Sequence, residues 1–173
     1  KTAYEIRNCD WSSDVCSSDL IRMVPYITRF KGGGVNLTPK IRVIKEKAAM
    51  ALIDGDNGMG HLVMKQATEL AIQKAKTAGV AWVGSVHSNH AGPASLYARM
   101  PLAHDMIGLY FAVGNANHLP PWGGLSMLLS TNPIACAIPA MHEPPVILDM
   151  ATTVTSYGKV KAKRQRGEMM PEG

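Results

Sequence analysis

The feature that most constrains the fold is an apolar stripe of helical period between two short apolar runs. From His61 to Ala78 the apolar side chains recur with helical spacing, and Gly79 follows where such a helix would end. Ala49–Ile53 and Val80–Val86, on either side, have the length and composition of strands. Strands that alternate with helices predict an α/β architecture.

The remaining segments extend this alternation. Helices are predicted over Ile21–Phe30, before a glycine run, and over Pro93–His104, although Pro101 lies inside the second. Strands are predicted at Ile41–Ile44, Met106–Val113, Ile134–Ile138 and Val146–Met150, and a turn or loop at Asp54–Gly60. Val146–Met150 is apolar on both faces, as a central buried strand would be. Together these elements predict an α/β fold with a mixed sheet and flanking helices.

Composition narrows the class of protein. The 173 residues are 46% hydrophobic and 18% charged, which is typical of a soluble domain with a buried core. The sequence has no apolar run long enough to span a membrane and no secretion-signal pattern. Lys and Arg exceed Asp and Glu by 18 to 13, too little to indicate nucleic-acid binding. We therefore expect a cytoplasmic protein whose partners include neither a membrane nor a nucleic acid.

Residues 1–20 differ in character from the rest. Asp10–Leu20 has neither helical nor strand periodicity and resembles the translation of a common sequencing-library adapter, and Lys1–Ile6 matches the outer part of the same oligonucleotide. We expect residues 1–20 to be adapter-derived and residues 21–173 to be a piece of a longer protein. Cys9 and Cys16 fall in the foreign segment, so Cys136 is left without an internal disulfide partner, which fits a reducing compartment.

Two loops are the first candidates for a site. Gly55–Gly60 precedes the predicted helix, but its spacing differs from the Gly-x-Gly-x-x-Gly fingerprint of a classical Rossmann site, and its acidic residues would repel a pyrophosphate. His87-Ser88-Asn89-His90 follows a predicted strand, where an imidazole can exchange a proton with a hydroxyl or carbonyl oxygen. His87 and His90 are also open to a metal-dependent hydrolase interpretation, or to being ordinary loop histidines.

Other polar residues are candidates for binding. Arg22 and Tyr26 share a helix face, so they would either bind a substrate carboxylate or be a solvent-facing Arg beside a half-buried Tyr. Asn115–Gly124 suits a binding loop or a structural turn. Asp149 would accept from ribose hydroxyls or cap the following helix. Lys159–Arg166, with five basic residues in eight, is a solvated helix face or a polyanion contact.

Several blocks in order along residues 21–173 resemble the malate/L-lactate dehydrogenase family, whose fold is not the Rossmann fold. The matching blocks are Asp54–Gly60, Ser88-Asn89-His90, Pro121–Gly124, Thr131–Ala135, Leu148–Thr152, Arg166–Glu168 and Pro171–Gly173. The resemblance implies a non-Rossmann NAD(P)-binding fold and hydride transfer between NAD or NADP and a small 2-oxo acid, giving a 2-hydroxy acid of the malate, lactate or ureidoglycolate class. It also implies a homodimer.

The resemblance assigns roles residue by residue. His90 matches the histidine of the family's Ser-Asn-His motif and would be the catalytic residue, as an acid–base or substrate-orienting group, while Arg22 and Tyr26 would hold the substrate carboxylate. The implied cofactor-binding residues are Gly114, Asn115, Asp149, Met150, Ala151 and Thr152, and no metal is implied.

Two departures from the family pattern matter. Its Ser-His-Gly motif would place a histidine at position 18, where this chain has Ser18, and the C-terminal half of the family's sequence is absent. We therefore predict that the isolated chain is inactive and only marginally stable, with apolar surface exposed where the missing half would pack. The alternative left open is a non-catalytic basic domain that binds a polyanion through Lys159–Arg166.

Overall fold

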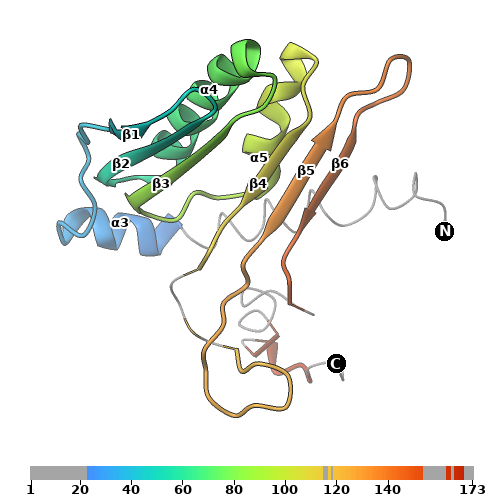
Figure 1. The fold of residues 1–173 in the computed structure, drawn as a ribbon. Coiled ribbons are helices and arrows are strands. Elements are labelled where there is room, and N and C mark those ends of the chain that lie inside the picture. Colours follow the sequence, from blue (N-terminus) through green and yellow to red (C-terminus); the bar gives the residue numbers. More distant parts are fainter. Residues whose placement is uncertain (1–22, 115–116, 118, 154–162, 165, 170–173) are drawn as a thin grey trace.

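The computed structural model describes residues 23–114, 117, 119–153, 163–164 and 166–169. Its first sheet contains β1 (Arg42–Glu46), β2 (Met50–Gly58) and β3 (Trp82–Ser88) in that order (Figure 1). β1 is antiparallel to β2, whereas β2 is parallel to β3, so the sheet is mixed. Helix α4 (Gly60–Ala78) connects the two parallel strands and ends at Gly79 with φ 77°. The predicted strand–helix–strand unit is confirmed.

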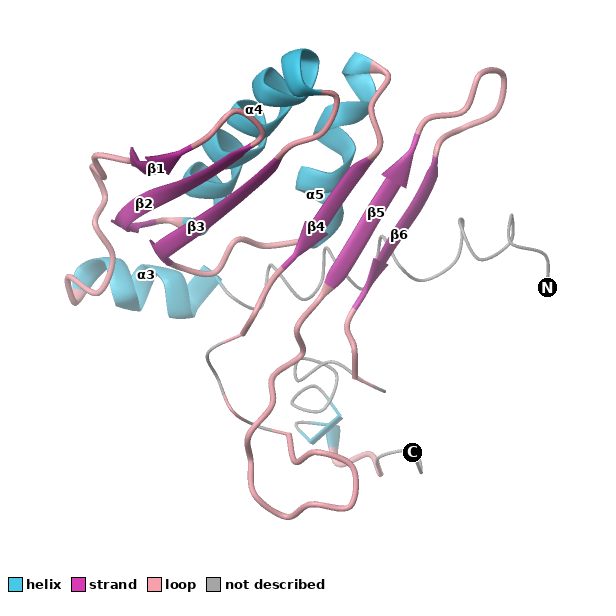
Figure 2. Ribbon diagram, in the orientation of Figure 1, coloured by secondary structure: helices cyan, strands magenta, loops and turns pink. Residues whose placement is uncertain are grey.

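The second sheet is antiparallel. It contains β4 (Gly108–Phe111), β5 (Ile134–Ile138) and β6 (Val146–Met150) in that order. Helix α5 (Ala94–Arg99) and the 3₁₀ turn η1 (Met100–His104) precede it in sequence. Figure 2 shows α4 and α5 covering the same side of the two sheets. The α/β class, the mixed sheet and the flanking helices are therefore confirmed.

Two apolar clusters hold the helices on the sheets. Ile53 of β2 packs against Val63 and Ala67 of α4, and all three are essentially buried. The second cluster lies between α5 and the second sheet and comprises Ala94, Tyr97, Ala98, Tyr110, Ala135 and Ala137. Met64 of α4 packs against both clusters, so this one side chain links them.

Residues Asp54–Gly60 are not the turn or loop that their composition predicts. β2 continues to Gly58, which pairs with Ser88 of β3 after a shift of register that begins at Asp54. The backbone angles expected of a turn do occur, with φ 49° at Asp56 and 54° at Asn57. They form an irregularity within the strand because pairing with β3 resumes beyond it.

Three other boundaries differ from expectation. The predicted helix Pro93–His104 divides into α5 and η1, since Pro101 fits the start of a 3₁₀ turn but not a helix interior. The strand expected at Met106–Val113 narrows to β4. Val146–Met150 is not a central strand: among the described strands β6 lies at the edge, with Val146 58% and Leu148 43% exposed.

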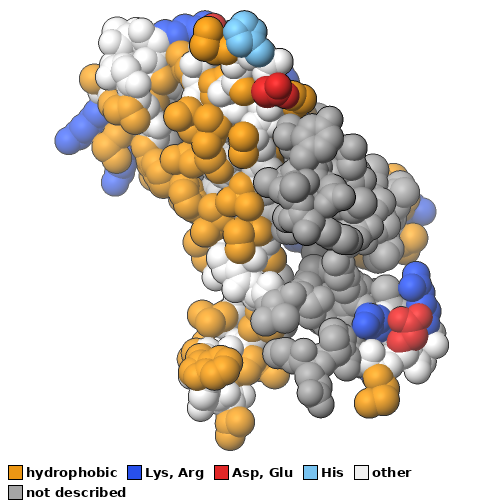
Figure 3. All heavy atoms as spheres, turned by 90° about the vertical axis from the view of Figure 1, so that its right-hand side faces the viewer, with side chains coloured by type: hydrophobic (Ala, Val, Ile, Leu, Met, Phe, Trp, Pro, Cys, Tyr) orange, Lys and Arg blue, Asp and Glu red, His pale blue; other side chains and the backbone are white. Residues whose placement is uncertain are grey.

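The side of the second sheet that faces away from α5 is apolar. Its exposed members in the paired strands include Leu109, Phe111, Ile138, Val146, Leu148 and Met150. Phe111 stacks on Trp82 of β3, with ring centroids 5.6 Å apart, which carries the apolar surface onto the first sheet. Figure 3 shows the resulting band of hydrophobic side chains. No helix in the described part of the chain combines the length and hydropathy needed to cross a membrane.

Candidate active site

The candidate site lies where the parallel strands β2 and β3 end. Helix α3 (Met23–Lys31) passes across these strand ends (Figure 1). Open α/β sheets bind ligands at the carboxyl ends of their parallel strands, where loops rather than regular pairing determine side-chain placement. Here the loop is Asn89–Pro93, between β3 and α5.

His90 and Tyr26 are brought together by this arrangement. The Tyr26 hydroxyl hydrogen-bonds to Nδ1 of His90, and the ring centroids are 6.0 Å apart. The backbone N–H of Gly92 donates to the same Nδ1 at 3.3 Å. Because a backbone N–H can only donate, Nδ1 is an acceptor, so the phenol donates and a neutral His90 ring carries its proton on Nε2. Arg22, the other predicted carboxylate ligand, lies outside the described residues.

The side chain of Asn89 connects the same loop to two neighbouring segments through hydrogen bonds. Its Nδ2 donates to the carbonyl oxygen of Asn57 at 2.9 Å, to Oδ1 of Asn57 at 2.9 Å and to the carbonyl oxygen of Gly58 at 3.0 Å. Its Oδ1 accepts from Nη2 of Arg29 at 2.9 Å. One side chain thus joins the end of β2, the loop after β3 and α3. Sequence reasoning did not single out Arg29 and placed Asn57 only within the Asp54–Gly60 block, since the sequence carries no signal for contacts between distant segments.

Two glycines allow the backbones to approach closely at this point. A Cβ on Gly60, at the start of α4, would lie 2.1 Å from the carbonyl oxygen of Asn89 and 2.6 Å from the carbonyl carbon of His90. A Cβ on Gly92 would lie 2.4 Å from Nε2 of His61, and Gly92 has φ 73°. The position of His90 therefore depends on the absence of side chains at both positions.

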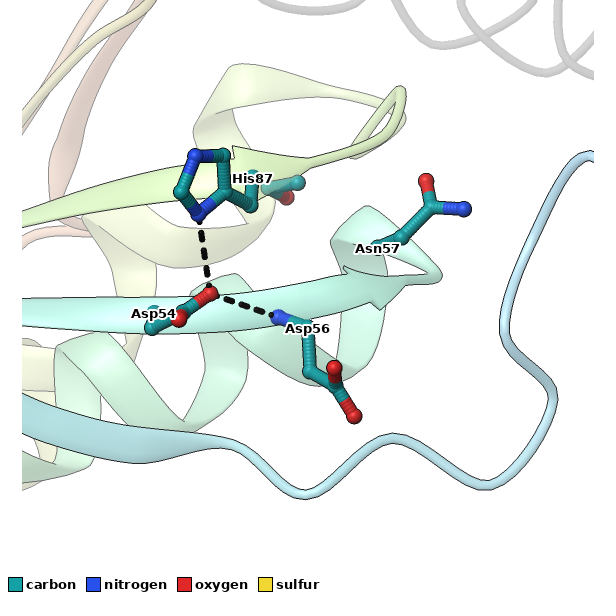
Figure 4. Close-up of a pocket in the computed structure, with 5 residues that line it drawn as sticks. Asp54, Asp56, Asn57 and His87 are labelled. Atoms are coloured by element: carbon teal, nitrogen blue, oxygen red, sulfur yellow. Dashed lines mark hydrogen bonds and ion pairs between the residues drawn. The ribbon is translucent and has the colours of Figure 1, made fainter.

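His87 faces a different group from His90. Its Nδ1 lies 3.1 Å from Oδ1 of Asp54, and the two side chains point toward one another from neighbouring strands (Figure 4). They line an open hollow of about 410 Å³ with Asp56, Asn57 and Ser88. Among the residues that the structure describes, no group of three or more His, Cys, Asp or Glu is arranged to hold a metal ion. The divergent partners of His87 and His90 give no support to the hydrolase interpretation.

Asp54 is held in its ionised form. The backbone N–H of Asp56, the His87 ring and the Arg42 guanidinium all donate to its carboxylate, the last at 3.1 Å. These contacts hold the pKa of Asp54 below its ordinary value of 3.8. The cluster fixes the end of β2 beside β3 and stands next to, but apart from, the His90 contacts.

Of the predicted cofactor residues, Gly114 and Thr152 lie at one end of the second sheet. The backbone N–H of Gly114 donates to Oδ1 of Asn132 at 2.9 Å. The backbone N–H and the hydroxyl of Thr152 donate to the carbonyl oxygen of Thr131 at 2.9 and 3.0 Å. The segment Thr131–Asn132 therefore connects Gly114 with Thr152, two of the predicted cofactor-binding residues. Met150 and Ala151 lead into Thr152 from β6, and Asn115 lies outside the described residues.

Asp149 connects this region with the His90 loop. Its Oδ2 accepts from the backbone N–H of Ser95 at 2.7 Å, in the first turn of α5. The capping role considered from the sequence is therefore real, but the helix capped precedes Asp149 in the chain instead of following it. Burial, together with the charge of Asp149, raises the pKa of the neighbouring Tyr110 to about 12.

The basic tract Lys159–Arg166 falls mostly outside the described residues. Of its members, Lys163, Arg164 and Arg166 are described. Arg166 lies 3.8 Å from Glu168, an exposed ion pair within the same short stretch. No described contact favours a polyanion as its ligand.

Comparison with known proteins places these features in a family. Residues 12–173 match the family described as Malate/L-lactate dehydrogenase. The chain belongs to this family. The membership inferred from the motif blocks is thus confirmed.

Several relatives of this dehydrogenase family align over most of the chain. Malate dehydrogenase of Pyrococcus horikoshii is 45% identical over 153 residues, 88% of this chain and 42% of that protein. L-sulfolactate dehydrogenase of Methanocaldococcus jannaschii is 40% identical over 152 residues, 88% of this chain and 44% of that protein. NAD(+)-dependent ureidoglycolate dehydrogenase of Escherichia coli O157:H7 is 31% identical over 156 residues, 90% of this chain and 44% of that protein. The chain thus spans less than half the length of these relatives.

Solved dehydrogenase structures share the fold. The sulfolactate dehydrogenase of Methanocaldococcus jannaschii superposes with a TM-score of 0.83 at 38% identity, over 93% of this chain and 47% of that one. The malate dehydrogenase of Pyrococcus horikoshii gives a TM-score of 0.76 at 44% identity, over 81% of this chain and 40% of that one.

Proposed function

We propose that residues 21–173 belong to an NAD(P)-dependent 2-hydroxy-acid dehydrogenase, a cytoplasmic homodimer that interconverts a small 2-oxo acid and its 2-hydroxy acid. The longer chain is called the intact protein below. Family membership supports the reaction class, since the matched relatives include malate, sulfolactate and ureidoglycolate dehydrogenases. Malate, lactate, sulfolactate and ureidoglycolate are the substrates to test.

The observation that carries the assignment of His90 is the pair of donors on its Nδ1. Tyr26 and Gly92 both contact that nitrogen, which places the proton of the neutral ring on Nε2, the group that would serve a substrate. In the reducing direction, Nε2–H hydrogen-bonds to the keto oxygen and passes its proton there as the carbonyl carbon becomes tetrahedral, while Nδ1 takes the hydroxyl proton of Tyr26, which solvent replaces. In the oxidising direction the same protons move in reverse, so that Nε2 accepts the substrate proton as Nδ1 returns its own to Tyr26.

This geometry favours a role for Tyr26 other than the predicted contact with the substrate carboxylate. Its hydroxyl proton is engaged with His90, so Tyr26 would orient the imidazole and offer the substrate carboxylate only its oxygen, which repels an anion. The carboxylate contact therefore falls to Arg22, whose guanidinium provides paired donors.

The cofactor residues proposed are Gly114, Asn115, Asp149, Met150, Ala151 and Thr152. The described members of this set fit a nucleotide in part. Asp149 presents a carboxylate, one oxygen of which accepts from the backbone N–H of Ser95. Gly114 and Thr152 both hydrogen-bond to the segment Thr131–Asn132. NADH or NADPH, when bound, supplies the hydride. Asp149 also positions the start of α5, so the same residue would couple the cofactor side of the site to the His90 loop.

The test is a steady-state assay of the intact protein with NADH and NADPH against a panel of 2-oxo acids. We expect saturable, substrate-dependent oxidation of one of the reduced cofactors. His90→Ala should lower kcat by about 10²-fold to 10⁴-fold, the usual contribution of a positioned acid–base group. His104→Ala, which removes an exposed imidazole from η1, should leave the rate unchanged. Full activity of His90→Ala on every substrate would refute the assignment.

A further inference from the structure

His61, in the first turn of α4, lies beside the candidate site but has no part in the mechanism above. Its half-buried ring meets the Tyr26 ring edge-to-face, with centroids 6.4 Å apart and an interplanar angle of 89°. This spacing and angle fall within the range in which aromatic rings attract one another.

The other end of the same ring abuts Gly92. Nε2 of His61 lies 2.4 Å from the place that a Cβ on Gly92 would occupy, so the imidazole fills the space of the missing side chain. Gly92 holds φ 73°, and its N–H donates to Nδ1 of His90 at 3.3 Å. The ring of His61 therefore blocks one side of the turn that delivers this N–H.

His61 thus contacts both groups that donate to His90. Tyr26 supplies the hydroxyl and Gly92 the backbone N–H, from segments 66 residues apart in sequence numbering, and the ring of His61 touches each. We propose that His61 is a positioning residue that holds the two donors on Nδ1 of His90 and thereby keeps the proton of His90 on Nε2.

The proposed action is packing and not proton transfer. The rings of His61 and Tyr26 meet edge-to-face, and Nε2 of His61 lies nearest the position of a Cβ on Gly92, which holds no donor or acceptor. A ring of similar shape without nitrogens should therefore replace His61. The kinetic part of this inference rests on the proposed dehydrogenase function, whereas the tautomer of His90 does not.

The experiment compares His61→Ala with His61→Phe in the intact protein, with His104→Ala as the matched loss of an exposed imidazole. Nitrogen-15 NMR of histidine-labelled protein reports which ring nitrogen of His90 carries the proton. We expect His90 to be uniformly protonated on Nε2 in the wild type and in His61→Phe. In His61→Ala the spectrum should become a mixture of tautomers, and kcat should fall between about 10-fold and 100-fold with KM changed less than kcat.

The outcomes separate the proposals. An unchanged His90 spectrum and kcat in His61→Ala would overturn the role of His61, as would His61→Phe being as impaired as His61→Ala. An inactive wild type with the expected spectra would refute the dehydrogenase function but not the positioning role.

If His61→Ala does not fold, Gly92→Ala is measured alone and together with His61→Phe. The new Cβ at position 92 would clash with the ring at position 61 and should shift the His90 spectrum. An unshifted spectrum would overturn the proposal.

Discussion

Substitution of Gly60 by alanine tests the packing of α4 against the His90 loop. The new Cβ would lie 2.1 Å from the carbonyl oxygen of Asn89 and 2.6 Å from the carbonyl carbon of His90. Both neighbours are backbone atoms, so no side-chain rotation relieves the overlap, and the two segments must separate by roughly 1 Å to restore van der Waals contact.

The size of the effect follows from two opposing contributions. Forced repacking of this kind costs about 1–3 kcal/mol, whereas alanine in place of glycine within a helix regains up to about 1 kcal/mol. We therefore expect the free energy of unfolding to fall by about 1–2 kcal/mol. A displacement of about 1 Å at His90 should also lower kcat by up to about 100-fold.

The assay is urea unfolding together with steady-state kinetics of the intact protein. Gly84→Ala is the matched control, because its Cβ would lie 3.3 Å from the flexible Cδ1 of Leu52 and away from the His90 loop. We expect Gly84→Ala to remain close to wild type in both measurements. Equal stability and equal activity in Gly60→Ala and Gly84→Ala would refute the reasoning.

Three further predictions concern neighbouring groups. Asn89→Asp keeps the acceptor for Arg29 but replaces the amide donor with a carboxylate facing carbonyl oxygens, so urea unfolding should show a larger loss of stability than in Asn89→Ala. Tyr110 has its pKa raised from 10.0 to about 12, so stability present below pH 10 should be lost as pH rises to about 12, by roughly 2–3 kcal/mol, and Tyr110→Phe should lack this alkaline slope in denaturant titrations. The lowered pKa of Asp54 gives stability that is present above pH 3.8 and lost as pH falls through the lowered value; an identical acid-unfolding curve for Asp54→Asn would contradict this.

The strand–helix–strand unit was predictable because its signal is local. The helical stripe, the flanking runs and the terminal Gly79 all lie within one stretch of sequence, and β2, α4 and β3 follow them. The continuation of β2 through Asp56 and Asn57 was not predictable, because the residue types that tolerate positive φ angles are the same in a turn and in an irregular paired strand. The edge position of β6 depends on strand order, which its own apolar pattern does not encode.

For the candidate site, the sequence predicted some of the residues but not the contacts between them. Ser88-Asn89-His90 and Tyr26 were found from motif and helical spacing, but the contacts of this loop with α3 join positions 60 or more apart in the sequence. The hydroxyl of Tyr26 facing His90, and the ring of His61 filling the space beside Gly92, arise from the meeting of α3, α4 and the loop after β3. Such meetings are set by tertiary packing, which no local pattern specifies.

The measurement that most directly tests the central claim is kcat for NAD(P)H oxidation by His90→Ala at saturating 2-oxo acid, without and with added imidazole. If Nε2–H of His90 delivers the proton, kcat falls by about 10²-fold or more and exogenous imidazole restores part of it. A His90→Ala variant with wild-type kcat, or with a loss confined to KM, would contradict the account.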